Sequence, residues 1–300
     1  MKEKVLITGA SGLLAKKLGK KLAHNGYHIN YLTTSKKNIS NNTFYWDYSK
    51  NHIDTEALNN VNHIVHLAGF NINNNWSAKN KKLMLDSRVQ TSNLIFDKCK
   101  ELNIRPQTFI SASAMGYYGF NQFGIKTENS EPGNDWMAKL CIKWERAADK
   151  FKTIGARIIK LRLSLVLDNN AEILLKSCIS FKFGFGVVFG NGRHPFPWIH
   201  IGDVIKFIHF GMTEKKLSGV FNLTSPQNIS HYDFIKAIQK TKYKNAKIIY
   251  APRLIISLLF PKKKVLLFNE FVLSSKKATN NKYQWLYPNI EDALNDLFNL

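Results

Sequence analysis

Short runs of apolar, often β-branched residues alternate with stretches of helical periodicity along the first half of the chain. Strands are predicted at 4–9, 27–34, 63–69, 107–113 and 156–167, and helices at 13–26, 78–102 and 136–154. In the first helix Leu14, Leu18 and Leu22 recur every four residues, and Asn25 with Gly26 ends the pattern. Repeated strand–helix–strand units favour a parallel sheet with helices on both faces, which is an α/β fold.

The pattern loosens after about residue 168. Residues 181–200 are rich in Gly, Pro and aromatic residues, which favours a loop region that forms one wall of a cleft. The C-terminal hundred residues return to helical patterning, with a capped helix start at 230–238 and a last helical stretch at 290–300. The apolar run 254–260 is too short to span a bilayer, so a packed helix is expected, with contact to a membrane surface as the alternative.

The charge is unusual, because 43 basic and 21 acidic residues give a net charge of +22 in 300 residues. Such an excess suggests nucleic-acid binding. However, 36 of the basic residues are lysines scattered in pairs and triplets, as at 16–17 and 36–37, and asparagine is abundant too. No nucleic-acid-binding motif accompanies them. We therefore expect a solvated basic surface and no nucleic-acid partner.

Cysteine and histidine usage excludes several classes of site. Cys99, Cys141 and Cys178 lie far apart without a CxxC motif, which argues against a disulfide framework or a zinc site. His63 and His66 fall on opposite faces of a predicted strand, so they do not form a metal pair. With no apolar signal region before the first strand, a cytoplasmic location is expected.

The first strand leads into a glycine motif. Gly9, Gly12 and Ala15 are spaced at i, i+3 and i+6, after the strand and at the start of the helix. The first glycine permits a tight turn, the second lets the backbone approach a pyrophosphate, and a small third residue lets helix and strand pack closely. The position of the motif between a strand and a helix predicts a dinucleotide site.

The end of the second strand indicates which dinucleotide. An acidic residue there would hold a ribose 2′-hydroxyl, but residues 32–38 read LTTSKKN, with hydroxyls and two lysines. This favours NADP(H) over NAD(H). The alternative is that Lys36 and Lys37 are two more solvated lysines. Asp47 follows at the position where an adenine amine would lie.

Several motifs occur in an order that resembles a known family. They are TGASGLLA (8–15), WD (46–47), HLAG (66–69), SRV (87–89), SASAMGYYG (111–119), CIKWERAA (141–148), GNGRHPFPWIHIGD (190–203) and LSGVFNLTSP (217–226). Together they resemble the extended short-chain dehydrogenase/reductase superfamily, the NAD(P)-dependent epimerase/dehydratase proteins. Within it they are similar to the "epimerase family" branch of sugar-nucleotide epimerase-like proteins, some of which are labelled cell-division inhibitors. The resemblance covers essentially the whole chain.

The resemblance implies a Rossmann fold, a doubly wound parallel sheet, with a smaller C-terminal substrate domain. The NADP-binding domain would comprise 1–167, with 198–226 returning to it, and 168–300 would be mainly the substrate-binding domain with a helical extension. Residues 269–278 depart from the glycine-rich run that is usual near the end of this branch. The resemblance therefore does not define the substrate-binding wall there. A small-molecule substrate is the implied partner. A homodimer is common in the superfamily.

The resemblance also implies a set of cofactor-binding residues. It assigns Thr8, Gly9, Ser11, Gly12 and Leu13 to the pyrophosphate, Thr34, Ser35 and Lys36 to the 2′-phosphate, Asp47 to the adenine, Leu67, Ala68 and Gly69 to the ribose, and Ser111, Ala112 and Ser113 to the nicotinamide end. Arg88 either contacts a phosphate or caps a helix.

The usual acid–base pair of this superfamily, YxxxK on a helix, is missing. Aligned through Glu145, its two positions are Met137 and Cys141, and neither side chain can do that chemistry. The same loss is usual in this branch. Two YxxxK matches, at 232–236 and 243–247, lie beyond the Rossmann portion and are expected to be coincidences.

Ser113, Tyr117 and Tyr118 remain as candidate catalytic residues. Ser113 lies four residues before Tyr117, which is the superfamily spacing, and would hold a substrate oxygen. Either tyrosine could transfer a proton with a cation nearby, or both could be structural. The leading hypothesis is an NADP(H)-binding oxidoreductase or epimerase-like enzyme for a small nucleotide-linked or anionic substrate. The alternative is a non-catalytic, NADP(H)-responsive regulatory protein.

Overall fold

The computed structural model describes residues 2–259, 261 and 264–300, which divide into two compact units. Unit 1 comprises the described residues of Met1–Tyr117, Trp136–Arg162 and Ile205–Phe221. Unit 2 comprises those of Tyr118–Asp135, Leu163–Val204 and Asn222–Leu300. The assignment of a cofactor-binding role to residues 1–167 and a substrate-binding role to 168–300 stays a prediction.

An eight-stranded sheet, most of which belongs to unit 1, has the order β12-β8-β6-β5-β1-β2-β3-β4. Its strands are β1 (Lys4–Thr8), β2 (His28–Thr33), β3 (Thr43–Asp47), β4 (His52–Ile53), β5 (His63–His66), β6 (Thr108–Ala114), β8 (Arg157–Leu163) and β12 (Gly219–Leu223). The five strands from β6 to β3 pair in parallel, and β4 is antiparallel to β3. The strand order reverses direction at β1, so the predicted doubly wound α/β fold is confirmed.

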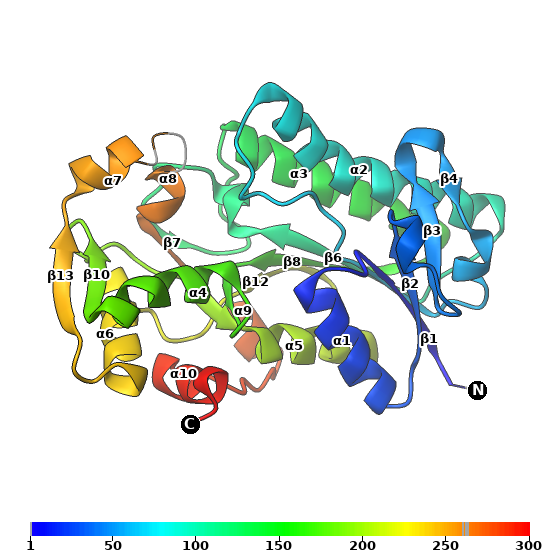
Figure 1. Ribbon diagram of the computed structural model, residues 1–300. Helices are drawn as coiled ribbons and strands as arrows, with labels where there is room; N and C mark the ends of the chain where they lie inside the picture. The colour runs from blue at the N-terminus through cyan, green and yellow to red at the C-terminus, as the bar shows by residue number, and fades with distance from the viewer. Residues whose placement is uncertain (1, 260, 262–263) are drawn as a thin grey trace. The chain divides into compact units, whose positions relative to one another are not determined.

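Helices cover both faces of this sheet. They are α1 (Leu13–His24), α2 (Ala78–Glu101), α3 (Trp136–Asp149) and α5 (Ile201–Thr213), and α5 begins in unit 2 before it enters unit 1. Helices α2 and α3 lie together on one face, and α1 and α5 lie on the other (Figure 1). Each predicted element of the first 167 residues is present, although the strand expected at 156–167 is split into β8 and a short β9.

The core of unit 1 explains why these strands are nearly continuous apolar runs. Leu6, Ile64 and Phe109, from three neighbouring strands, are fully buried and belong to one cluster. Phe109 stacks on Phe151, with ring centroids 3.7 Å apart, which packs the 3₁₀ turn that follows α3 against β6. Both faces of the central strands are covered, so these strands show no polar alternation.

Unit 2 contains three two-stranded parallel sheets and several short helices. Its strands are β7 (Gly124–Lys126), β9 (Leu165–Leu167), β10 (Phe185–Phe189), β11 (Trp198–His200), β13 (Lys247–Ala251) and β14 (Phe271–Leu273), and its helices are α4 (Glu172–Ile179), α6 (His231–Lys242), α7 (Arg253–Leu259), α8 (Lys264–Leu267), α9 (Lys276–Asn280) and α10 (Ile290–Phe298). Short 3₁₀ turns over the two units lie at Lys36–Asn38, Tyr48–Lys50, Thr55–Leu58, Met115–Tyr118, Lys150–Ile154 and Ser180–Phe183.

The expectation of a loop region at 181–200 was right for 190–197, which has no regular strand, and wrong for the rest. That stretch contains β10, which pairs in parallel with β13, and β11, which pairs with β9. Each partner strand is distant in sequence, so local periodicity could not reveal the pairing. The capped start of α6 is confirmed, because Ser230 and Asp233 form a reciprocal capping box and Phe234 and Ile238 are fully buried.

Asp203 holds the C-terminal segment of unit 2 against the start of α5. Its side chain is 1% exposed, and its carboxylate accepts hydrogen bonds from the backbone N–H of Leu286 (2.7 Å) and of Tyr287 (3.0 Å). The hydroxyl of Tyr283 lies 3.1 Å from the same carboxylate and 2.8 Å from the Asp203 carbonyl oxygen. Burial, and secondarily Asp203, raise the pKa of Tyr283, so the phenol stays protonated.

We expect Asp203→Asn to lower the free energy of unfolding by about 1–3 kcal/mol, because the amide has an NH2 group in place of one carboxylate oxygen and so leaves one backbone N–H facing another donor. Urea titration followed by circular dichroism measures the change. The exposed Asp97→Asn is the matched control and should shift stability by less than about 0.5 kcal/mol. Equal effects of the two substitutions would contradict this role of Asp203.

Candidate functional site

The loop between β1 and α1 is built around two glycines. Gly9 has φ +77°, and a Cβ there would approach the Cα of Ala68 to 3.2 Å. The N–H of Gly12 donates to the carbonyl oxygen of Gly9 at 2.8 Å, and a Cβ on Gly12 would lie 3.1 Å from that oxygen. The left-handed backbone and the close approaches both require glycine. The loop therefore keeps its backbone uncovered by side chains.

Helix α1 begins directly after this loop with its first backbone N–H groups uncapped by a side chain. Gly12 is the N-cap residue, and the first turn contains no acidic residue. Ser11 and Gly12 are exposed and Leu13 is half-buried, whereas Ala15 is 1% exposed against the sheet. The positive end of the helix dipole and its N–H donors suit an anion such as a pyrophosphate.

Thr8 stabilises the glycine loop between β1 and α1, which together with the N-terminus of α1 is called the cradle below. Its buried hydroxyl accepts hydrogen bonds from the backbone N–H of Leu67 (3.0 Å) and of Ala68 (2.9 Å). The end of β1 is thereby tied to the segment that follows β5, so the two candidate walls are held together. Leu67 is half-buried, Ala68 is buried and Gly69 is exposed. The predicted contact of these residues with a cofactor is not tested by the fold itself.

The end of β2 carries hydroxyl and lysine side chains. Thr34 and Lys36 are exposed and Ser35 is half-buried, and no acidic residue lies between 33 and 38. The ammonium of Lys36 is 5.4 Å from the centroid of the Tyr45 ring. A solvent-accessible cation at this place suits the ribose 2′-phosphate of NADP(H) better than the ribose 2′-hydroxyl of NAD(H).

Asp47 has a local structural role. Its carboxylate accepts hydrogen bonds from the hydroxyl (2.6 Å) and the N–H (3.0 Å) of Ser49, and it caps the 3₁₀ turn at Tyr48–Lys50. The Ser49 hydroxyl is the largest cause that lowers the pKa of Asp47. The carboxylate is half-buried, and its predicted contact with an adenine amine stays a prediction.

Arg88 lies behind the segment that follows β5. Its Nη1 donates to the carbonyl oxygens of Phe70 (3.1 Å) and Met84 (2.9 Å), and its guanidinium is 4.9 Å from the centroid of the Trp144 ring. A Cβ on Gly69 would lie 2.7 Å from Arg88 Cζ, so this glycine allows the close approach. Burial lowers the pKa of Arg88 to about 10, which keeps it charged at neutral pH.

The candidate nicotinamide end, at the end of β6, contains a buried polar network. Ser111 donates to the carbonyl oxygen of Ala112 at 2.9 Å, and all three residues from Ser111 to Ser113 are buried. The hydroxyl of Ser113 donates to Oε1 of Glu145 at 2.8 Å. Because a hydroxyl has one proton, Ser113 has only lone pairs left for a further ligand.

Glu145 and Arg162 form an ion pair beneath Ser113. Nε of Arg162 donates to Oε1 of Glu145 at 2.8 Å and Nη2 donates to Oε2 at 3.1 Å, with both side chains buried. The Arg162 guanidinium lies only 3.3 Å from the centroid of the Tyr117 ring. Sequence reasoning used Glu145 only for alignment and did not single out Arg162. The i, i+17 separation carries no pattern that would have revealed the pair.

Met137 and Cys141 occupy the positions of the missing acid–base pair and are both buried. The space at Gly116 is filled from this side, because a Cβ there would lie 2.7 Å from Met137 Cγ and 3.8 Å from Cys141 Sγ. Burial raises the pKa of Cys141 to about 12, so the thiol is neutral. Lys139 and Lys143 are exposed, as expected for neighbours off this face.

The two candidate tyrosines differ in their surroundings. Tyr118 is fully buried, and its hydroxyl lies 2.6 Å from Asn222 Oδ1 and 2.9 Å from the Thr127 carbonyl oxygen. Both neighbours are acceptors, so they hold the phenolic proton in place. Tyr117 is half-buried against Arg162. Among the two, Tyr117 is therefore the better candidate for proton transfer.

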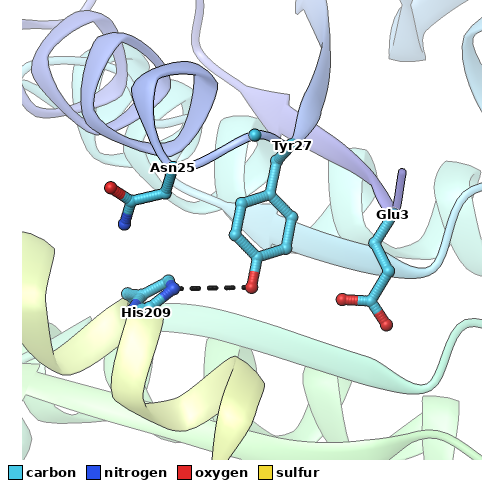
Figure 2. A pocket seen from close by; sticks show the side chains of 5 residues that line it. Glu3, Asn25, Tyr27 and His209 are labelled. Atoms are coloured by element: carbon cyan, nitrogen blue, oxygen red, sulfur yellow. Dashed lines mark hydrogen bonds between the residues drawn. The ribbon is translucent and has the colours of Figure 1, made fainter. Parts of the chain in front are cut away.

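A pocket of about 470 Å³ lies elsewhere on unit 1 (Figure 2). It is lined by Glu3, Asn25, Gly26, Tyr27 and His209, and the Tyr27 hydroxyl lies 3.4 Å from His209 Nε2. Glu3 precedes the start of β1, whereas the glycine loop follows its end. Because ligands of open α/β sheets bind outside the carboxyl ends of the strands, this pocket is distinct from the cofactor cradle.

Other classes of site find no support in the part of the chain that the structure describes. Those residues contain no group of three or more His, Cys, Asp or Glu side chains placed to hold a metal ion. All three cysteines are free and buried. No helix among the described residues is long and apolar enough to cross a membrane. The YxxxK match at 243–247 runs from the end of α6 into β13, so its two residues do not share a helix face.

A glycine cradle at a helix N-terminus, at the carboxyl end of β1 in a doubly wound sheet, defines a Rossmann-type dinucleotide-binding protein. Residues 5–224 match the NAD dependent epimerase/dehydratase family. The chain belongs to that family, as its motifs suggested.

Relatives of similar length extend this result. An epimerase family protein of Staphylococcus epidermidis is 30% identical over 307 residues, covering 98% of this chain and 99% of the relative, and one from Staphylococcus aureus strain N315 is 29% identical over 304 residues, covering 97% and 98%. The human epimerase family protein SDR39U1, isoform 2, has a crystal structure with NADPH; it matches with a TM-score of 0.85 at 22% identity, covering 99% of this chain and all of that one. A Bacillus cereus UDP-glucuronic acid 4-epimerase in complex with NAD matches with a TM-score of 0.76 at 18% identity, covering 99% and 97%. These structural matches support the fold.

His66, the last residue of β5, generates a pH prediction. It is fully buried, its Nε2 lies 3.0 Å from the Thr91 hydroxyl, and burial lowers its pKa to about 3. The unfolded chain binds a proton near pH 6.5, so stability from neutral His66 is complete above that pH and is lost as the pH falls toward 3.

We therefore expect His66→Gln to flatten the fall of the unfolding free energy between pH 6.5 and pH 4, by up to about 1.4 kcal/mol per pH unit. Denaturant titrations at several pH values measure the slope. The exposed His28→Gln should leave the slope as it is in the unchanged protein. An unaltered slope in His66→Gln would contradict the buried neutral imidazole.

Proposed function

We propose that this protein is an NADP(H)-dependent oxidoreductase or epimerase-like enzyme that acts on a small nucleotide-linked or anionic substrate. A bound nicotinamide cofactor would supply or accept the hydride. Two features support this proposal most directly. The N-terminus of α1 follows Gly9 and Gly12 without a side-chain cap, and the segment after β2 contains Lys36 and no acidic residue. The NADPH in the crystal structure of the human relative supports the same choice of cofactor.

The cofactor residues follow from this cradle. Gly9, Ser11, Gly12 and Leu13 would contact the pyrophosphate, and Thr34, Ser35 and Lys36 the 2′-phosphate. Thr8 and Arg88 would act by bracing, because the hydrogen bonds of both side chains go to the backbone around residues 67–70 and 84. Leu67 to Gly69 and Ser111 to Ser113 would line the remaining length of the dinucleotide.

The proposed role of Ser113 follows from the direction of its hydrogen bond. Its proton is donated to Glu145, so its oxygen would accept a hydrogen bond from a substrate hydroxyl. The Arg162 guanidinium holds Glu145 in place from the other side. The Arg162 guanidinium also lies 3.3 Å from the centroid of the Tyr117 ring, whereas the hydroxyl of Tyr118 is held by two buried acceptors. Tyr117 is therefore the proposed acid–base group.

A specific observation favours a second function, an NADP(H)-responsive protein without turnover. Met137 and the neutral thiol of Cys141 are packed where an acid–base pair would work, so the usual proton path is closed. In that case the cradle would bind cofactor and the occupied state would control a partner. The two proposals share the cofactor and differ in whether substrate is turned over.

The cofactor proposal predicts that NADPH binds more tightly than NADH. Lys36→Glu should raise the Kd for NADPH about tenfold or more and change the Kd for NADH little, because only NADPH carries the 2′-phosphate. Isothermal titration calorimetry measures both constants. Lys139→Glu, an exposed lysine on α3, is the control for net charge. Tighter NADH binding by the unchanged protein would exclude the proposed selectivity.

The catalytic proposal predicts turnover that depends on Tyr117 and Ser113. With NADP(H) and a panel of carbonyl, alcohol and sugar-nucleotide substrates, Tyr117→Phe and Ser113→Ala should each lower kcat about a hundredfold or more. Tyr243→Phe, which removes a coincidental YxxxK match, should retain activity. Cofactor binding without turnover of any substrate would favour the regulatory protein.

A further inference from the structure

Exposed apolar side chains are concentrated in one part of unit 2. Of fifteen large apolar side chains that are exposed among the described residues, nine lie in two segments, 175–185 and 249–258. They are Leu175, Ile179, Phe183, Phe185, Ile249, Tyr250, Leu254, Ile255 and Leu258. We call these nine residues the apolar surface. Exposed apolar side chains gathered in one part of a protein mark candidate interaction sites.

The two segments are joined through β10 and β13. The N–H of Lys247, at the start of β13, donates to the Gly184 carbonyl oxygen at 2.8 Å, next to Phe183 and Phe185. At the other end, Gly190 donates to the Ala251 carbonyl oxygen at 2.8 Å, two residues before α7. Figure 1 shows β10 and β13 side by side, with α7 directly beyond the end of β13. The apolar surface therefore belongs to one local substructure.

The helical segments present apolar residues outward as well as into the core. Leu175, Ile179 and Phe183 recur every four residues along α4 and the following 3₁₀ turn and are 52%, 53% and 76% exposed. In α7, Leu254 and Leu258 are 82% and 80% exposed, whereas Ile256 between them is 5% exposed. Of the α7 side chains that the structure describes, only Ile256 is buried. The side away from Ile256 is an apolar face of stacked leucines.

The charged residues in the two segments of the apolar surface are mostly basic. Residues 172–190 and 243–259 contain five basic residues, Lys176, Lys182, Lys244, Lys247 and Arg253, and one acidic residue, Glu172. Glu172 is paired with Lys176. Lys182, Lys244 and Lys247 are exposed, and the Arg253 side chain is 62% exposed and lies 3.5 Å from Glu270 Oε1. The side chains around the apolar surface thus carry a net positive charge.

We propose that the apolar surface binds the surface of an anionic lipid bilayer. Leucine, isoleucine and phenylalanine side chains would enter the acyl boundary, Tyr250 would lie at headgroup level, and the basic residues would face the lipid phosphates. A second copy of this chain is opposed by the charge, because symmetric contact would bring two positive surfaces together. The overall charge of +22 favours approach to a negative membrane.

Sedimentation with lipid vesicles tests this proposal. The full chain should bind vesicles of phosphatidylglycerol and phosphatidylcholine at least tenfold more tightly than vesicles of phosphatidylcholine alone, and raised salt should weaken the binding. The double substitution Leu254→Ser with Leu258→Ser should weaken binding to the anionic vesicles tenfold or more. Phe123→Ser, an equally polar change at a side chain 68% exposed elsewhere in unit 2, should bind as the unchanged protein does.

Circular dichroism and the Tm of each variant verify that the exposed substitutions leave the fold intact. Three results would overturn the proposal. They are equal binding to both kinds of vesicle, anionic binding that the leucine substitutions leave unchanged, and a dimer in solution that the same substitutions dissociate. The first would show that lipid charge does not contribute to binding, the second would assign the binding to a diffuse lysine surface, and the third would assign the apolar surface to self-association. None of these results depends on NADPH binding or turnover.

Discussion

The buried ion pair between Glu145 and Arg162 organises the candidate nicotinamide end of this protein. It joins α3 to β8, orients the Ser113 hydroxyl and supports the Tyr117 ring. Removing one partner of such a pair leaves an uncompensated charge in the interior, typically at a cost of about 3–5 kcal/mol. The positions of Ser113 and Tyr117 therefore depend on an ion pair between two other residues, Glu145 and Arg162.

The same constraint gives the absent YxxxK pair a physical consequence. Where a tyrosine and a lysine would place a hydroxyl and an ammonium, the chain packs a thioether and a neutral thiol. The positive charge on this side comes instead from Arg162, beside Tyr117, and from Arg88, behind the segment after β5. Charge has been kept near the strand ends, but on residues that are fixed by hydrogen bonds and cannot easily give up a proton.

Much of the fold was predictable because its signals are local. The runs that became β1, β2, β5 and β6 and the glycine turn before α1 each depend on residues within one segment. The strands β10 and β13 were missed because each is short and its pairing partner is some sixty residues away. Likewise, the sequence identified Ser113 as a candidate but not Arg162, because a salt bridge between a helix and a strand leaves no periodic trace.

Cys141 has a consequence for the chemical durability of this centre. A thiol reacts with oxidants and alkylating agents through its thiolate, and burial keeps this one protonated with a pKa of about 12. The candidate site therefore contains a sulfur atom that is expected to resist oxidation. Covalent probes directed at cysteine should label Cys141 poorly. Reagents that react with phenols or bind the dinucleotide cradle are better suited to probe this site.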